Sequence, residues 1–133
     1  MTLKELQLKV KNVKPLRGAW SKGIVEYMNE LVEDTIEGYG EDYELPEGTK
    51  EFNKLLLNGA DTWKDYSYGG SSLIFNDDIA ERLANASELK QTKNGQLPPN
   101  KKEEWLDVQA RALYQASNEL ANLVFNRPLI YTR

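Results

Sequence analysis

The chain of 133 residues contains no cysteine and no histidine. Their absence excludes disulfide scaffolds, thiolate nucleophiles and Cys/His zinc sites, together with Ser-His-Asp triads and histidine acid–base chemistry. Catalysis would have to use carboxylates, Lys, Tyr or Ser with an oxygen-bound divalent ion. We therefore expect no catalytic residues, no metal site and no cofactor.

Long apolar runs are also missing. No stretch approaches the roughly 20 apolar residues of a membrane span, and the first residues lack the apolar core of a secretory signal. We therefore expect a cytoplasmic protein without a membrane partner. With no repeat, low-complexity segment or interdomain linker, the chain is predicted to form a single domain over residues 1–133.

The net charge of −4 conceals a strong separation of charge. Residues 1–22 hold six basic residues and one acid, whereas residues 23–51 hold ten acids and one lysine. Such an acidic block can repel nucleic acid, imitate its phosphates or keep a helix soluble. We interpret it as a solvated helix face. Because it directly follows the basic amino terminus, no direct binding to duplex nucleic acid is expected.

Apolar periodicity predicts a mainly α-helical fold. Apolar residues from Ala19 to Ile36 recur at spacings of three and four, which is typical of an amphipathic helix. A second long amphipathic helix is predicted from Lys101 to about Phe125, opened by Asn100 and Glu103 at the spacing of a capping box. Short helices and ordered loops lie between these two. The short helices are expected over residues 52–57 and 79–84.

Adjacent acids occur at two predicted helix starts, Asp77-Asp78 and Glu103-Glu104. Acids at such positions bind free backbone amides and interact favourably with the helix dipole. We therefore interpret both pairs as caps rather than as catalytic carboxylates. Asp78 and Glu81 have the spacing of a capping box.

Both ends of the chain look strand-like. Leu6-Gln-Leu8-Lys-Val10-Lys11 alternates apolar and polar residues, as a half-buried strand does. Leu129-Ile-Tyr131-Thr could pair with it in a small two-stranded ribbon that joins the termini. The domain then divides into a basic, strand-like lead-in over 1–17, a helical core over 18–125 and a carboxy-terminal extension over 126–133.

An apolar seam follows the last predicted helix through Leu106, Leu113 and Leu120. It should face the stripe of Trp20, Ile24 and Met28 on the first long helix, or the same seam of a second subunit. The sequence does not distinguish these arrangements, so a homo-oligomer is left open.

The strongest candidate site is an aromatic and glycine-rich stretch over residues 63–72. Its rings offer stacking surfaces, its glycines allow close backbone approach, and nearby arginines could pair with an anionic ligand. In the alternative interpretation, the rings fill the core and Arg111 pairs with Asp107. The predicted ligand-binding residues are Trp63, Tyr66, Tyr68, Gly69, Gly70, Arg82 and Arg111.

A set of short motifs lies between residues 17 and 115: Arg17-Gly-Ala-Trp20 with Gly23, Leu57-Asn-Gly-Ala60, Trp63, Tyr66-Ser-Tyr-Gly-Gly70, Leu73-Ile74, Asp78-Ile-Ala-Glu-Arg-Leu83, Ser87-Glu-Leu-Lys90, Thr92, Asn94-Gly95, Pro99-Asn100 and Glu103-Glu-Trp-Leu-Asp-Val-Gln-Ala-Arg-Ala-Leu-Tyr-Gln115. In these motifs the chain resembles a family of small uncharacterised proteins encoded by phages and conjugative elements of Gram-positive bacteria. The resemblance covers about three quarters of the chain and implies a biological context, but no activity and no site.

Small accessory proteins of mobile elements are often counter-defence factors, so the resemblance implies a binding protein of this kind. Its expected partner is a host defence protein, which it would inhibit, or a small nucleotide signal, which it would sequester. The alternative is a nucleotide-handling enzyme that uses carboxylates and a divalent ion.

Overall fold

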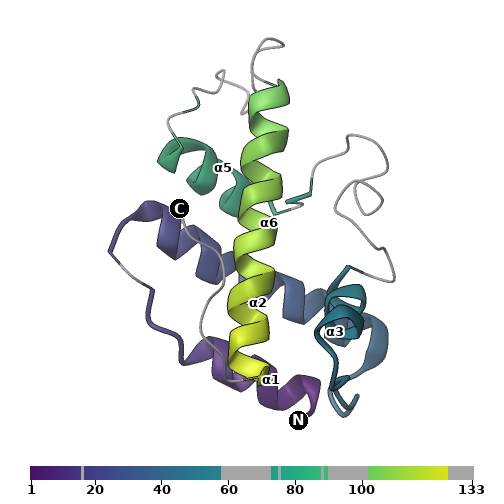
Figure 1. Cartoon of the computed structure of the whole chain (residues 1–133). Helices are drawn as coiled ribbons and strands as arrows, with labels where there is room; N and C mark the ends of the chain where they lie inside the picture. Colours follow the sequence, from purple (N-terminus) through teal and green to yellow (C-terminus); the bar gives the residue numbers. More distant parts are fainter. Residues whose placement is uncertain (16, 58–72, 75, 88, 90–101, 126–133) are drawn as a thin grey trace.

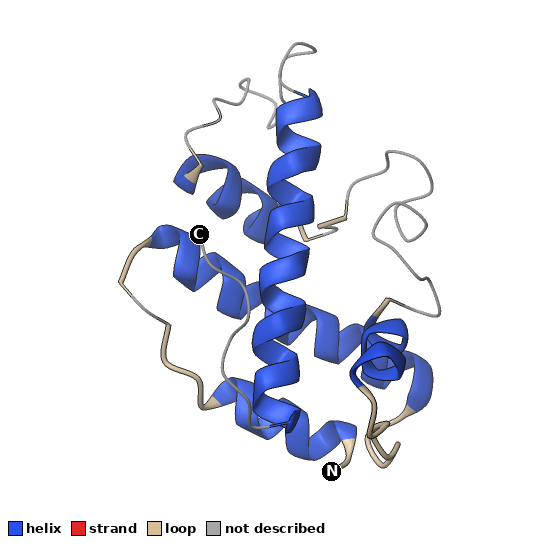
Figure 2. Cartoon of the chain, in the orientation of Figure 1, coloured by secondary structure: helices blue, strands red, loops and turns tan. Residues whose placement is uncertain are grey.

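The computed structural model describes residues 1–15, 17–57, 73–74, 76–87, 89 and 102–125 (Figure 1). These residues form five helices and no strand, which confirms the predicted mainly helical fold (Figure 2). The helices are α1 (Leu3–Lys11), α2 (Ala19–Tyr39), α3 (Thr49–Leu56), α5 (Asp77–Ala86) and α6 (Lys102–Phe125).

Helix α2 is the centre of the fold. It packs against each of the four other helices, and α6 also contacts α1 and α3. In Figure 1, α6 crosses in front of α2, and α1 lies near the end of α6. All five helices contribute buried side chains to one hydrophobic core, among them Leu6, Ile24, Phe52, Leu83 and Leu120.

The amino-terminal segment is a helix, so the predicted strand over residues 6–11 is wrong. Leu3, Leu6 and Val10 are fully buried at spacings of three and four, whereas Leu8 is 53% exposed. Thr2 and Glu5 form a capping box that starts α1. The alternation over residues 6–11 is too short to distinguish the two-residue period of a strand from the 3.6-residue period of a helix. The capping box and the buried stripe show that the segment is a helix.

This correction also changes the predicted domain plan. The lead-in over 1–17 contains α1, which packs into the core rather than preceding it. The ribbon therefore loses its amino-terminal strand, while its second strand, over residues 129–132, lies outside the described residues.

Helix α5 begins earlier than predicted, and its cap is Asn76 rather than Asp78. The Asn76 side chain accepts hydrogen bonds from the backbone N–H groups of Asp78 and Ile79 at 3.0 and 3.2 Å. An asparagine is among the best N-cap residues, which explains why it takes this position two residues upstream. The Asp78–Glu81 spacing is therefore internal to the helix.

A polar residue in the apolar pattern of α6 has a structural role. Gln109 is fully buried, and its Oε1 accepts hydrogen bonds from the backbone N–H groups of Leu73 and Ile74 at 2.8 and 3.0 Å. From the other side, the Tyr27 hydroxyl donates to the Leu73 carbonyl at 3.2 Å. The buried Leu73–Ile74 segment is thus held by both α2 and α6.

The apolar seam of α6 packs into the hydrophobic core of the chain through Leu113 and Leu120. Leu113 and Leu120 are 3% and 0% exposed and share one core with Ile24 and Met28 of α2. The predicted packing of the seam against α2 is confirmed for these two leucines, whereas Leu106 is only half-buried and does not belong to this core.

Candidate functional site

The predicted ligand site can be followed only in part. Arg82 lies on α5, where its Nε is 2.8 Å from Glu26 Oε1 of α2. Arg111 is exposed on α6, and no ion pair among the described residues joins it to Asp107. The other predicted residues lie outside the described part of the chain: Trp63, Tyr66, Tyr68, Gly69 and Gly70. The proposed assembly of these residues into one site stays a prediction.

The surroundings of Arg82 do not favour an anionic ligand. A polar cavity of about 420 Å³ there is lined by Arg82, Asn85 and three acids, Glu26, Asp78 and Glu81. Arg82 is the one cation among the described lining residues, and it is already paired with Glu26. An anion entering this cavity would therefore meet more negative than positive charge.

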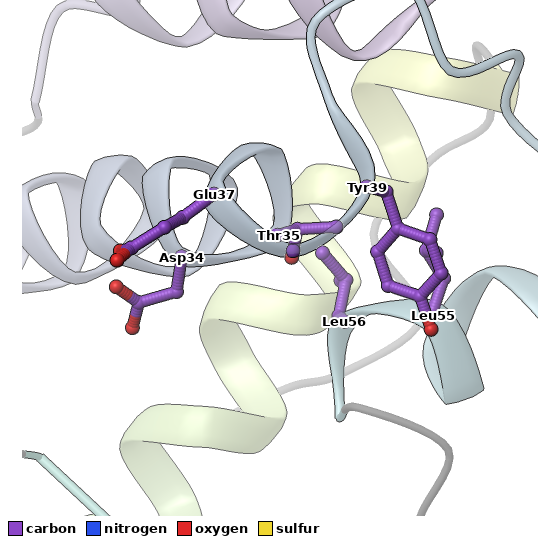
Figure 3. Close-up of a pocket in the computed structure, with 7 residues that line it drawn as sticks. Asp34, Thr35, Glu37, Tyr39, Leu55 and Leu56 are labelled. Carbon is purple, nitrogen blue, oxygen red and sulfur yellow. The ribbon is translucent and has the colours of Figure 1, made fainter.

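A second cavity lies where the end of α2 meets α3 (Figure 3). It measures about 320 Å³, and we call it the α2–α3 pocket. Buried side chains form part of its lining, while its acids and its tyrosine are exposed. The lining residues are Asp34, Thr35, Glu37, Gly38, Tyr39, Leu55 and Leu56.

The pocket has two chemically different ends. In Figure 3 the carboxylates of Asp34 and Glu37 lie at one end, and the Tyr39 ring lies beside Leu55 at the other. Thr35 and Leu56 lie between them in this view. The pocket therefore presents negative charge at one end and apolar surface at the other.

The end of α2 holds Tyr39 in place. Gly40 has φ 93° and ψ 155°, a conformation that is essentially restricted to glycine. Its N–H donates to the Ile36 carbonyl at 2.7 Å, and the chain then turns so that the Tyr43 ring packs 4.9 Å from the Tyr39 ring. The Tyr43 carbonyl accepts from Leu3 N–H at 3.0 Å, which fixes this turn to α1.

The carboxyl-terminal half of α2, residues 30–39, carries acids that form no ion pair with a described cation. Glu33, Asp34 and Glu37 lie near a helix end where the macrodipole favours cations, and the last turn contains no basic residue. Burial, followed by the charges of Glu37 and Glu33, raises the pKa of Asp34. None of these three acids forms an ion pair with another described residue.

Glu30 lies one turn earlier and extends this negative region. Burial, and then the charge of Asp34, raises its pKa to about 7, although a hydrogen bond from the Asn76 backbone acts in the opposite direction. The acids repeat at helical spacing along α2, but no group of three or more metal-ligating side chains occurs among the described residues.

Sequence reasoning missed the α2–α3 pocket because it treated the acidic block as a solvated face. One signal was visible: a predicted helix with three acids and no base in its last two turns, followed at once by Tyr39 and Tyr43. The contribution of Leu55 and Leu56 depends on the tertiary packing of α3 and has no local sequence signal.

No family model matches the chain, and no curated protein or solved structure matches it either. Among the described helices, none combines the length and apolar character needed to cross a membrane. The function must therefore be inferred from the chemistry of the site.

Proposed function

We propose that this chain is a non-enzymatic binding protein that recognises a basic surface of a protein partner with the carboxyl-terminal half of α2. The observation that carries this proposal is a cluster of acids at a helix end that favours cations, none of which forms an ion pair with another described residue. Such a conflict costs stability, and natural proteins keep local conflicts of this kind mainly at functional sites. A cationic partner would relieve it.

The aromatic residues beside the acids support a protein partner. Tyr39 and Tyr43 are 42% and 41% exposed and pack against each other at the edge of the acidic region. Tyrosine is enriched at the energetic centres of protein interfaces. Nucleic acid is a poor partner for this face, because its phosphates would be repelled by the carboxylates.

The proposed partner is a host defence protein, which makes the chain a cytoplasmic counter-defence inhibitor of a phage or conjugative element. The motif resemblance over residues 17–115 supports this context. An acidic face also suits the obstruction of a basic surface through which a defence protein would bind nucleic acid. Sequestration of an anionic nucleotide receives less support, because Arg82 is paired with Glu26.

The test combines phage plating with partner capture in hosts that carry defined defence systems. We expect the parent chain to restore plating in at least one of them and to crosslink to a component of that system. A triple variant that neutralises the acidic region should lose both effects while still melting cooperatively. Its substitutions are Glu33→Gln, Asp34→Asn and Glu37→Gln.

A matched control removes the same number of charges from exposed acids elsewhere, and it should keep both effects. Its substitutions are Glu47→Gln, Glu81→Gln and Asp107→Asn. Full activity of the acidic-region variant would contradict the proposal, as would the absence of any plating effect or partner. Turnover of a nucleotide panel with magnesium or manganese would favour the enzymatic alternative instead.

A further inference from the structure

We infer that the α2–α3 pocket binds the side chain of a single arginine presented by the protein partner. This inference rests on the proposed function and names the contact that would anchor the complex. It is drawn from the size of the pocket, from its two chemically different ends and from the exposed tyrosine at its rim.

The size of the pocket suits one side chain. Its volume of about 320 Å³ lies at the lower limit of the range, about 300–1,000 Å³, that is usual for small-molecule sites. Asp34 and Tyr39 are five positions apart on α2, which corresponds to about 7.5 Å along the helix axis. An extended long side chain spans this distance, whereas an anionic nucleotide would be repelled by Asp34 and Glu37.

The acidic end supplies the acceptors that a guanidinium needs. Asp34 and Glu37 are close enough for the charge of one to raise the pKa of the other, and neither forms an ion pair with a described residue. A guanidinium carries five donors in a rigid fork and can bind two carboxylates at once. The ammonium of lysine is a compact, more strongly hydrated charge, and it gains less here.

The apolar end suits the methylene stem of the same side chain. Leu55 and Leu56 are 7% and 4% exposed, and Tyr39 adds a large ring at the rim. The Thr35 hydroxyl already donates to the Leu31 carbonyl at 2.7 Å, so this donor does not face the pocket unsatisfied. Long basic side chains lay their stems on apolar surface while the charged group reaches polar partners.

The direct test is an amide-resolved NMR titration with three blocked tripeptides, Gly-X-Gly, in which X is arginine, lysine or citrulline. Citrulline has the shape of arginine without its charge. We expect the arginine peptide to bind with a Kd of roughly 1–10 mM, as befits one side chain. The shifts should centre on Gly38, Tyr39 and Leu55. Lysine should bind more weakly, and citrulline should not shift these amides.

Two variants and their controls locate the binding. Asp34→Asn and Tyr39→Ala should each weaken arginine binding by about fivefold or more, because one loses a charge-assisted hydrogen bond and the other loses the apolar rim. The matched controls Asp107→Asn and Tyr114→Ala change exposed residues of α6 and should bind as the parent does. Equal binding of citrulline and arginine would overturn the inference, as would unchanged binding by Asp34→Asn.

The pocket inference and the proposed function can fail separately. If arginine peptides leave the pocket amides unshifted but the acidic-region triple variant loses its partner, the acidic face is functional and the arginine pocket is wrong. If the arginine peptide binds in the pocket while the triple variant keeps its partner, the pocket stands and the proposed function falls.

Discussion

The two halves of α2 differ in whether their polar side chains bond to neighbouring helices. In the amino-terminal half, residues 19–29, Glu26 pairs with Arg82 of α5, and Trp20 Nε1 donates to Gln115 Oε1 of α6 at 2.9 Å. In the carboxyl-terminal half, Glu33, Asp34 and Glu37 have no ion-pair partner among the described residues. The amino-terminal half of α2 therefore bonds to neighbouring helices through its polar side chains. The acids of the carboxyl-terminal half make no such ion pair among the described residues and could bind a cationic partner.

This difference separates structural polar groups from functional candidates. An exposed ion pair such as Arg82–Glu26 contributes little stability, typically below about 1 kcal/mol, but it neutralises both members. Unpaired acids at a helix carboxyl terminus cost stability instead, because they oppose the macrodipole. The unpaired half is therefore where a charged ligand has most to contribute.

The largest expected effect on stability comes from adding a methyl group in the amino-terminal half of α2, at Gly23. A Cβ at Gly23 would lie 2.5 Å from Leu83 Cδ2, and Leu83 is fully buried between α5 and α2. Gly23→Ala should therefore lower the free energy of unfolding by about 1–3 kcal/mol, despite the better helix propensity of alanine. Urea denaturation measures the change. An unchanged or higher stability would show that α5 does not pack closely on Gly23.

How much of the fold and of the candidate site could be predicted from the sequence depends on how many residues the apolar pattern spans. The apolar spacing of α2 continues over the whole helix, so its span could be predicted from the sequence. The alternation over residues 6–11 is too short for this, and it wrongly predicted a strand where α1 is a helix. Gln109 is polar within the apolar pattern of α6, and only the structure gives the reason: it accepts hydrogen bonds from the buried N–H groups of Leu73 and Ile74. The α2–α3 pocket needs contacts between separate helices, and local patterns do not encode these.

An intermediate effect is expected at the junction of the halves, where Glu30 titrates. Its pKa of about 7 in the folded chain exceeds the ordinary value of 4.5, so folding retains a proton that the unfolded chain releases between these values. The stability that Glu30 contributes is therefore complete below about pH 4.5 and is lost as the pH rises through 7. Asp34 and Glu33 face the same region and strengthen the effect.

Glu30→Gln removes this titration while keeping an oxygen that can accept from Asn76 N–H. At pH 8 the variant should be more stable than the parent by about 1 kcal/mol, after allowance for the half-exposed position of the side chain. The difference should shrink towards zero near pH 4.5. Thermal unfolding across this range measures it, and parallel curves for the two proteins would contradict the assignment.

The smallest expected effect comes from a glycine-to-alanine substitution in the carboxyl-terminal half of α2, at Gly38. Its sign is opposite to that of Gly23→Ala. Gly38 is helical and exposed, and a Cβ there would have no neighbour within 4 Å. Gly38→Ala should therefore raise the free energy of unfolding by about 0.4–1 kcal/mol, because alanine loses less backbone entropy on folding. Urea denaturation beside Gly23→Ala gives a matched pair in one helix. A loss of stability as large as that of Gly23→Ala would show that this end of α2 is packed as tightly as its beginning, and it would remove the open surface on which the binding proposal depends.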